Sequence, residues 1–158
     1  MEENYIIILR ESLEKKVRIL RDIIHSNEEQ RSILEDDNAP ADEFERNVDA
    51  KDALVRQIVE LDDGFDELFK KVEGELSSNR EKYASEIKRM QDLIREITDL
   101  SAKVQSQEKV NYDLAKLKFA GIRKQVKKVR QSQKAVSSYY QSMGRGTYYD
   151  PQFFDSNK

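Results

Sequence analysis

The scarcity of turn-forming residues most constrains what this chain can fold into. Only five glycines and two prolines occur in 158 residues, and turns depend heavily on these two residue types. The clearest interruptions are residues 35–43, which contain Pro40, and residues 74–82, which contain Gly74; both are rich in Asp, Asn or Ser. A chain with so few breaks must form few, long secondary-structure elements.

Between these breaks, apolar residues recur at steps of three and four, the period of an α-helix. The pattern predicts helices over about residues 3–36, 41–76 and 79–142. The apolar stripes comprise, in order, Ile6, Leu9, Leu13, Val17, Leu20, Ile24 and Leu34; then Phe44, Val48, Val55, Ile58, Leu61, Phe65, Leu68, Phe69, Val72 and Leu76; then Tyr83, Ile87, Met90, Ile94, Ile97, Val104, Asn111, Leu114, Leu117, Phe119, Ile122, Val126, Val129, Val136 and Tyr140. Asn27 and Arg31 would make the end of the first stripe polar.

Helix lengths then set the architecture. Helices of 34 to 36 residues are each about 50 Å long, and the short turn between the first two predicts an antiparallel hairpin. Residues 80–142 as one straight helix would span about 95 Å, so this helix either bends near residues 99–103 and folds back, or needs another chain. We therefore predict an all-α, coiled-coil-like bundle of three or four helices over residues 1–142.

Few residues could carry out chemistry. There is no cysteine, and the one histidine, His25, cannot by itself form a His or Cys metal site or a Cys/His pair. No glycine-rich phosphate loop occurs. We expect no enzyme activity, no cofactor and no metal, with His25 on the surface. The acidic N-terminus and the lack of any run of about 18 apolar residues predict a cytoplasmic protein that does not span a membrane.

The charge is unevenly distributed. Residues 102–135 have a net charge of +8, residues 136–158 are neutral, and residues 1–101 carry −11. A basic segment can bind nucleic acid, but an apolar stripe through Phe119, Ile122 and Val126 serves a helix packed on an acidic hairpin better. We expect no nucleic acid among the partners and keep a nucleic-acid-binding helical protein as the weaker alternative. A second alternative function is that of a structural coiled-coil protein that self-associates.

Residues 143–158 break the helical period and form a predicted flexible aromatic tail. Tyr and Phe give large contact area at low rotamer cost. The end of the third helix outruns the hairpin, and a stripe without an internal partner is a candidate binding surface. The candidate partner-binding residues are Ile122, Val126, Val129, Val136, Tyr139, Tyr140, Tyr148, Tyr149, Phe153 and Phe154. Alternatively, the tail folds back over its own bundle, and the two roles are compatible.

Three stretches resemble the FlgN family of flagellar export chaperones: "ILRESLEKKVRILRDII" in the first helix, "KDALVRQIVELDDGFDELFKKV" in the second, and "KVNYDLAKLKF" with its Asn111. The ending "PQFFDSNK" is similar to the ends of some members. This resemblance implies an all-α cytoplasmic chaperone that binds the helical terminus of hook-associated proteins, keeps it unassembled, and docks at the membrane export gate. Self-association into a homo-oligomer is compatible with it.

Overall fold

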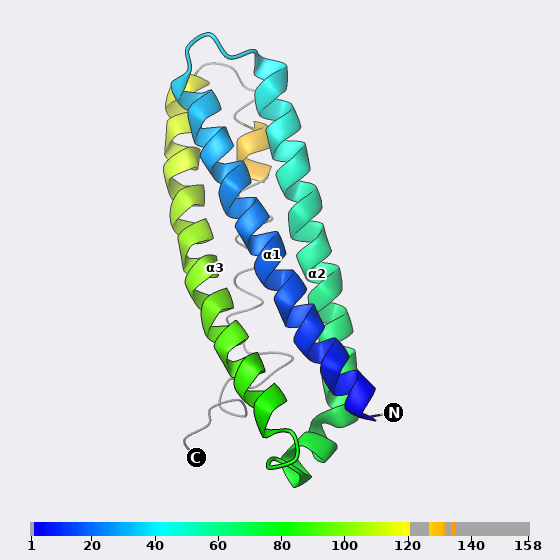
Figure 1. Cartoon of the computed structure of the whole chain (residues 1–158). Helices are drawn as coiled ribbons and strands as arrows, with labels where there is room; N and C mark the ends of the chain where they lie inside the picture. Colours follow the sequence, from blue (N-terminus) through cyan, green and yellow to red (C-terminus); the bar gives the residue numbers. More distant parts are fainter. Residues whose placement is uncertain (1, 121–126, 132–133, 135–158) are drawn as a thin grey trace.

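The computed structural model describes residues 2–120, 127–131 and 134 (Figure 1). Three long helices form the molecule: α1 (Glu2–Glu35), α2 (Ala41–Ser78) and α3 (Ala84–Lys118). Residues 127–131 are also helical, and the described part of the chain contains no strand. The predicted all-α bundle is confirmed.

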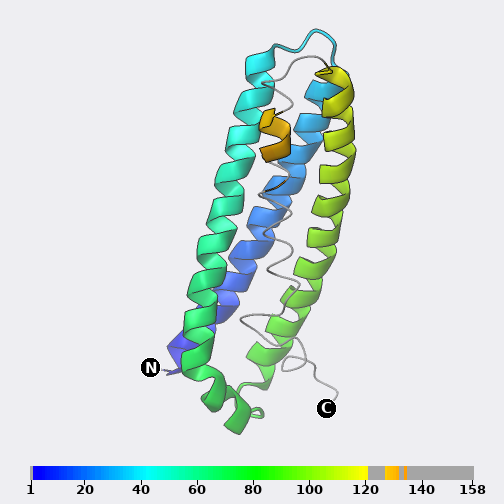
Figure 2. The same ribbon diagram turned by 180° about the vertical axis from the view of Figure 1, so that it is seen from behind.

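α1 is the central helix. α2 runs antiparallel to α1, and α3 runs parallel to α1 on its other side (Figure 1). α1 packs against both neighbours, whereas no Cα of α2 lies within 8 Å of a Cα of α3. Seen from behind, residues 127–131 lie between α2 and α3, on the side that faces away from α1 (Figure 2). We call this side the fourth-helix position.

The first two helices lie within two residues of their predicted bounds. Pro40 stands at the N-cap of α2 with φ −65°, and Asp42 and Glu43 lie in its first turn, where negative charge suits the positive end of the helix dipole. In the connection, the backbone N–H of Asn38 donates to Asp36 Oδ1 over 2.9 Å. This local bond closes the turn that the Asp and Asn residues predict.

The third helix differs from its prediction. α3 begins at Ala84 rather than near residue 79, continues without a break through residues 99–103, and ends at Lys118 rather than near residue 142. At its C-cap, Phe119 packs against Phe44 of α2 in a tilted arrangement, with ring centroids 5.1 Å apart.

The end of α3 also secures the end of α1. Lys118 Nζ donates to the carbonyl oxygen of Ile33 over 3.0 Å, which also accepts from the backbone N–H of Asp36 over 3.3 Å. α3 therefore matches the length of the hairpin, and within the described residues it has no overhang. The predicted tail, residues 143–158, and residues 135–142 of the predicted third helix lie outside the described residues.

Two separate apolar clusters fill the interior. The main core occupies the half of the bundle that holds the α2–α3 turn. It consists of Ile6, Leu9, Leu13, Val17, Ile19, Leu20, Ile23, Ile24, Ile58, Phe65, Phe69, Val72, Leu76, Tyr83, Ile87, Met90, Leu93, Ile97 and Val104. The loop-end cluster, next to the α1–α2 connection, consists of Leu34, Phe44, Val48, Ala115, Phe119 and Val129.

Polar residues separate the two clusters. Asn27 and Gln30 of α1, Lys51 of α2, and Glu108 and Asn111 of α3 are all buried. The prediction that the α1 stripe becomes polar is right for Asn27 but wrong for Arg31, which is exposed and pairs with Glu35 at 2.6 Å. Gln30 takes its place because the buried stripe continues in steps of three and four from Ile23 to Leu34.

Leu117 was also assigned to the buried stripe of the third helix, and this is wrong. It is 79% exposed, whereas Glu108, Asn111 and Ala115 face inward. Leu117 lies two residues after Ala115, and a step of two turns a side chain about 200° around the helix. The apolar residue chosen at position 117 therefore lies on the solvent-facing side of α3.

Candidate functional site

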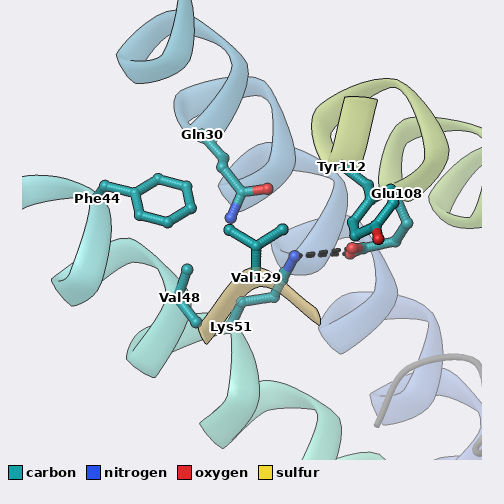
Figure 3. A pocket seen from close by; sticks show the side chains of 7 residues that line it. All are labelled: Gln30, Phe44, Val48, Lys51, Glu108, Tyr112 and Val129. Carbon is teal, nitrogen blue, oxygen red and sulfur yellow. Dashed lines mark hydrogen bonds and ion pairs between the residues drawn. The ribbon is translucent and has the colours of Figure 1, made fainter. Parts of the chain in front are cut away.

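A small pocket lies at the loop end of the fourth-helix position. Residues from all three long helices line it, and Val129 from the segment 127–131 sits in its centre (Figure 3). The lining residues are Gln30 of α1; Phe44, Val48 and Lys51 of α2; and Glu108 and Tyr112 of α3. We call this the loop-end pocket.

A buried ion pair crosses the pocket. Lys51 Nζ lies 2.9 Å from Glu108 Oε2 and 2.8 Å from Glu108 Oε1, and the two side chains are only 2% and 8% exposed. The pair joins α2 to α3, whose backbones do not approach each other. Removing two charges from water is costly unless they are paired closely, as they are here. The pair therefore fixes how the two outer helices face each other.

Amide side chains form the floor on the α1 side. Gln30 Nε2 donates to Asn47 Oδ1 over 2.9 Å, and Asn47 Nδ2 donates to the carbonyl oxygen of Ser26 over 3.0 Å. On α3, Asn111 Nδ2 donates to the carbonyl oxygen of Asn27 over 3.0 Å. Because these amides are buried and paired, they specify one alignment of the three helices at this end.

The opposite wall is apolar. Phe44 and Val48 line this wall, and Phe119 of the same cluster packs against Phe44 at an interplanar angle of 53°. With Val129 in place, the remaining cavity is about 10 Å³, roughly the space that one water molecule needs. The pocket thus offers an aliphatic side chain an apolar wall on one side and a charged pair on the other.

A second buried ion pair lies in the main core. Lys16 Nζ of α1 is 2.9 Å from Asp62 Oδ1 of α2, with the side chains 1% and 7% exposed. Burial lowers the pKa of Lys16 from its ordinary value, and the charge of Asp62 opposes that shift. The Lys16–Asp62 pair joins α1 to α2. The Lys51–Glu108 pair joins α2 to α3, so of these two pairs it is Lys51–Glu108 that borders the fourth-helix position.

The one histidine, His25, lies on the protein surface. His25 has a side chain that is 72% exposed, 3.9 Å and 3.7 Å from carboxylate oxygens of Glu28 and Glu29, as the surface position predicted. Within the described residues, no group of three or more His, Cys, Asp and Glu side chains is placed to hold a metal ion. No described helix is long and apolar enough to cross a membrane.

One of the predicted partner-binding residues, Val129, can be placed. It is 7% exposed, so the expectation that it lacks an internal partner is wrong: Phe44, Val48, Ala115 and Phe119 form its cluster. Whether it contacts another protein stays a prediction. The remaining predicted residues lie outside the described residues: Ile122, Val126, Val136, Tyr139, Tyr140, Tyr148, Tyr149, Phe153 and Phe154.

The sequence analysis missed the polar side of the pocket. Lys51 lies three residues after Val48 and four before Val55, and Glu108 lies four after Val104 and three before Asn111. Both therefore continue the buried stripes of their helices. A lysine in one stripe and a glutamate in another, of opposite sign, was the available signal for a buried pair.

A comparison with protein families now adds to this geometry. The model of the family described as "FlgN protein" matches residues 1–147, nearly the whole chain. The chain belongs to the FlgN family. The family is one of flagellar export chaperones, so the FlgN resemblance is confirmed and the general role is that of a chaperone in flagellar export. No curated protein and no solved structure gives a significant match.

Proposed function

We propose that this FlgN-family chaperone binds the helical terminus of a hook-associated flagellar protein at its fourth-helix position. One observation carries the proposal. α2 and α3 both pack on α1 but leave their facing sides apart, and the one described element between them is the helical segment 127–131 (Figure 2). Four-helix bundles fill such a position with a helix, and an amphipathic helix is the partner that a groove between helices accepts.

The loop-end pocket is where we expect the partner to be anchored. It combines Phe44, Tyr112 and the Lys51–Glu108 pair, and aromatic residues beside a desolvated charged pair are typical of binding hot spots. A helix held there is covered along one face and is kept from assembling with its own copies, which is what a chaperone for an assembling protein must achieve.

The test uses a matched pair of tyrosines. Tyr112 lines the pocket and is partly buried, and Tyr5, also partly buried, packs on the main core at the other end of the bundle. Titration calorimetry should show micromolar binding of the helical terminus of a hook-associated protein. Tyr112→Ala should weaken this binding about tenfold, a typical hot-spot loss, and Tyr5→Ala less than twofold. Equal losses from both variants would rule out the loop-end pocket as the anchor.

The aromatic residues beyond Met143 are proposed as additional contacts with the same partner. Tyr and Phe bury large areas per residue, which makes them effective anchors at interfaces. Deleting residues 144–158 should leave helix content by circular dichroism unchanged and should weaken binding in the same titration. If the truncated chain binds with unchanged affinity, the tail takes no part.

Delivery is the last part of the proposal. We infer that the loaded chaperone acts in the cytoplasm and docks at the membrane export gate. The complex of the chaperone with a hook-associated protein should bind the cytoplasmic part of the gate in pull-down experiments more strongly than the free chaperone does. Sedimentation of the free protein tests self-association, which is the main rival explanation for an unpartnered helical face.

A further inference from the structure

The chain already occupies its own loop-end pocket. Val129 is buried between Phe44 and Val48 on one side and Lys51 and Glu108 on the other (Figure 3). It is the sole buried side chain among the described residues after Ala120, because residues 127, 130, 131 and 134 are exposed and Lys128 is partly exposed. One aliphatic side chain therefore carries the apolar contact of this segment with the pocket.

An ion pair within the described residues adds to this contact. Lys128 Nζ lies 3.0 Å from Asp49 Oδ1 of α2, with side chains 29% and 67% exposed. An exposed pair of this kind contributes little and is screened by salt. α2 and α3 each place several side chains in the main core, whereas among the described residues this segment is held by Val129 and the Lys128–Asp49 pair. Contacts of this size should be displaced more easily than those of either long helix.

We propose that residues 127–131 are an internal competitor that closes the loop-end pocket until a partner helix displaces them. This inference rests on the proposed function and adds its regulation. Val129 and Lys128 also indicate which side chains the partner helix must carry. A helix that replaces them must bring an aliphatic side chain into the position of Val129, directly preceded by a lysine or arginine that reaches Asp49.

The competitor role predicts how the affinity for the partner changes when the closed state is weakened. A partner that binds the open state alone has an apparent dissociation constant raised by the fraction of molecules that are closed. Weakening the closed state must therefore strengthen partner binding. A segment that is simply part of the fold, or part of the partner interface, predicts the opposite or no effect.

The affinity test uses three variants of the full chain, titrated with the helical terminus of a hook-associated protein. Val129→Asp places a charge against the apolar wall and should raise affinity by about tenfold, which corresponds to a closed fraction of about nine-tenths. Lys128→Glu, which loses only the exposed pair, should raise it about threefold. Arg130→Glu makes the same charge change on an exposed neighbour and should stay within about twofold of the wild type.

Charge reversal on both sides completes this test. The double variant Asp49→Lys with Lys128→Glu re-forms the pair with opposite signs and also repels the lysine or arginine of the partner from position 49, so its affinity should fall below that of the wild type. If Val129→Asp weakens the complex or leaves it unchanged, or if Arg130→Glu acts as strongly as Lys128→Glu, the competitor role is wrong.

A second measurement does not depend on any partner. The chain has no cysteine, so a single thiol can report on opening. Val48→Cys places a thiol in the loop-end pocket, and Val72→Cys places one at an equally buried site of α2 in the main core. Val129→Asp should speed the reaction of Cys at position 48 with a thiol reagent by about tenfold, again the closed fraction of nine-tenths, and leave position 72 unchanged.

The two measurements separate the inference from the function on which it rests. If position 48 opens but hook-associated proteins bind no variant, the internal competitor stands and the proposed partner is wrong. If these proteins bind every variant alike and position 48 stays protected, the function stands and the competitor is wrong. If both thiols become reactive in Val129→Asp, the segment is ordinary core and the inference is overturned.

Discussion

The two halves of the bundle are built differently although the same three helices run through both. The main core is filled almost entirely by aliphatic and aromatic side chains, with one buried pair, Lys16–Asp62. The loop end has a small apolar cluster and a layer of buried amides and the Lys51–Glu108 pair. Apolar burial stabilises a fold without specifying direction, whereas paired polar groups specify geometry at a cost in stability.

This difference suggests that the main core stabilises the fold and the loop end binds the partner. The main core contains side chains from all three long helices, so we expect the loop end to open without loss of the fold. Regions with few buried apolar contacts open at lower free energy than the rest of a molecule. The pocket that we assign to partner binding lies in the half that can open.

The largest expected effect comes from breaking the loop-end pair. Lys51→Met leaves Glu108 charged and buried, which should lower the free energy of unfolding by about 3–5 kcal/mol. Lys51→Met together with Glu108→Met removes both charges and should recover most of the loss. Urea unfolding followed by circular dichroism measures both.

The control for this pair is Lys88→Met. Its partner Asp92 is 2.8 Å away on the same helix, and both side chains are well exposed, so the change should cost no more than about 1 kcal/mol. If Lys51→Met costs as little as Lys88→Met, water reaches the pocket pair and the loop end is not a dry, specified site.

Matched leucines on α1 compare the two halves directly. Leu20 is fully buried in the main core, and Leu34 is 6% exposed in the loop-end cluster. Leu20→Ala should cost about 2–5 kcal/mol. Leu34→Ala should cost less than half as much as Leu20→Ala, since the end of a bundle can relax around a smaller side chain. Equal costs in urea unfolding would mean that the loop end is packed as firmly as the main core.

Much of this fold could be predicted from the sequence. Steps of three and four, interrupted near Pro40 and again near Ser77, Ser78 and Asn79, are a local signal, so the type and approximate bounds of α1 and α2 follow from it. The end of α3 could not be predicted in this way. It depends on Phe119 meeting Phe44, a contact between residues 75 positions apart, and periodicity within one helix carries no information about such contacts.

The same limit explains what was missed in the site. Lys51 and Glu108 occupy stripe positions, but each alone reads as a surface charge, because a buried charge is rare unless paired. Their pairing exists only once α2 and α3 face each other. Val129 was identified as a candidate from its stripe, and its burial by the same chain follows from the early end of α3 at Lys118.

Two buried glutamines give the smallest and most discriminating comparison. Gln30 at the loop end donates to Asn47, whereas Gln91, 3% exposed beside Met90 and Leu93 in the main-core half, has no hydrogen-bond partner for either amide atom among the described residues. Gln30→Met would leave the Asn47 oxygen buried and unpaired, which should lower the free energy of unfolding by about 1–3 kcal/mol.

Gln91→Met should instead raise the free energy of unfolding by about 1 kcal/mol, because it replaces an unpaired amide by an apolar side chain of similar length. The opposite signs follow from the two environments and not from the residue type, which is the same in both. Urea unfolding of the two variants side by side measures the signs. Two losses of similar size would mean that Gln91 has a partner after all, and that polar pairing extends through both halves of the bundle.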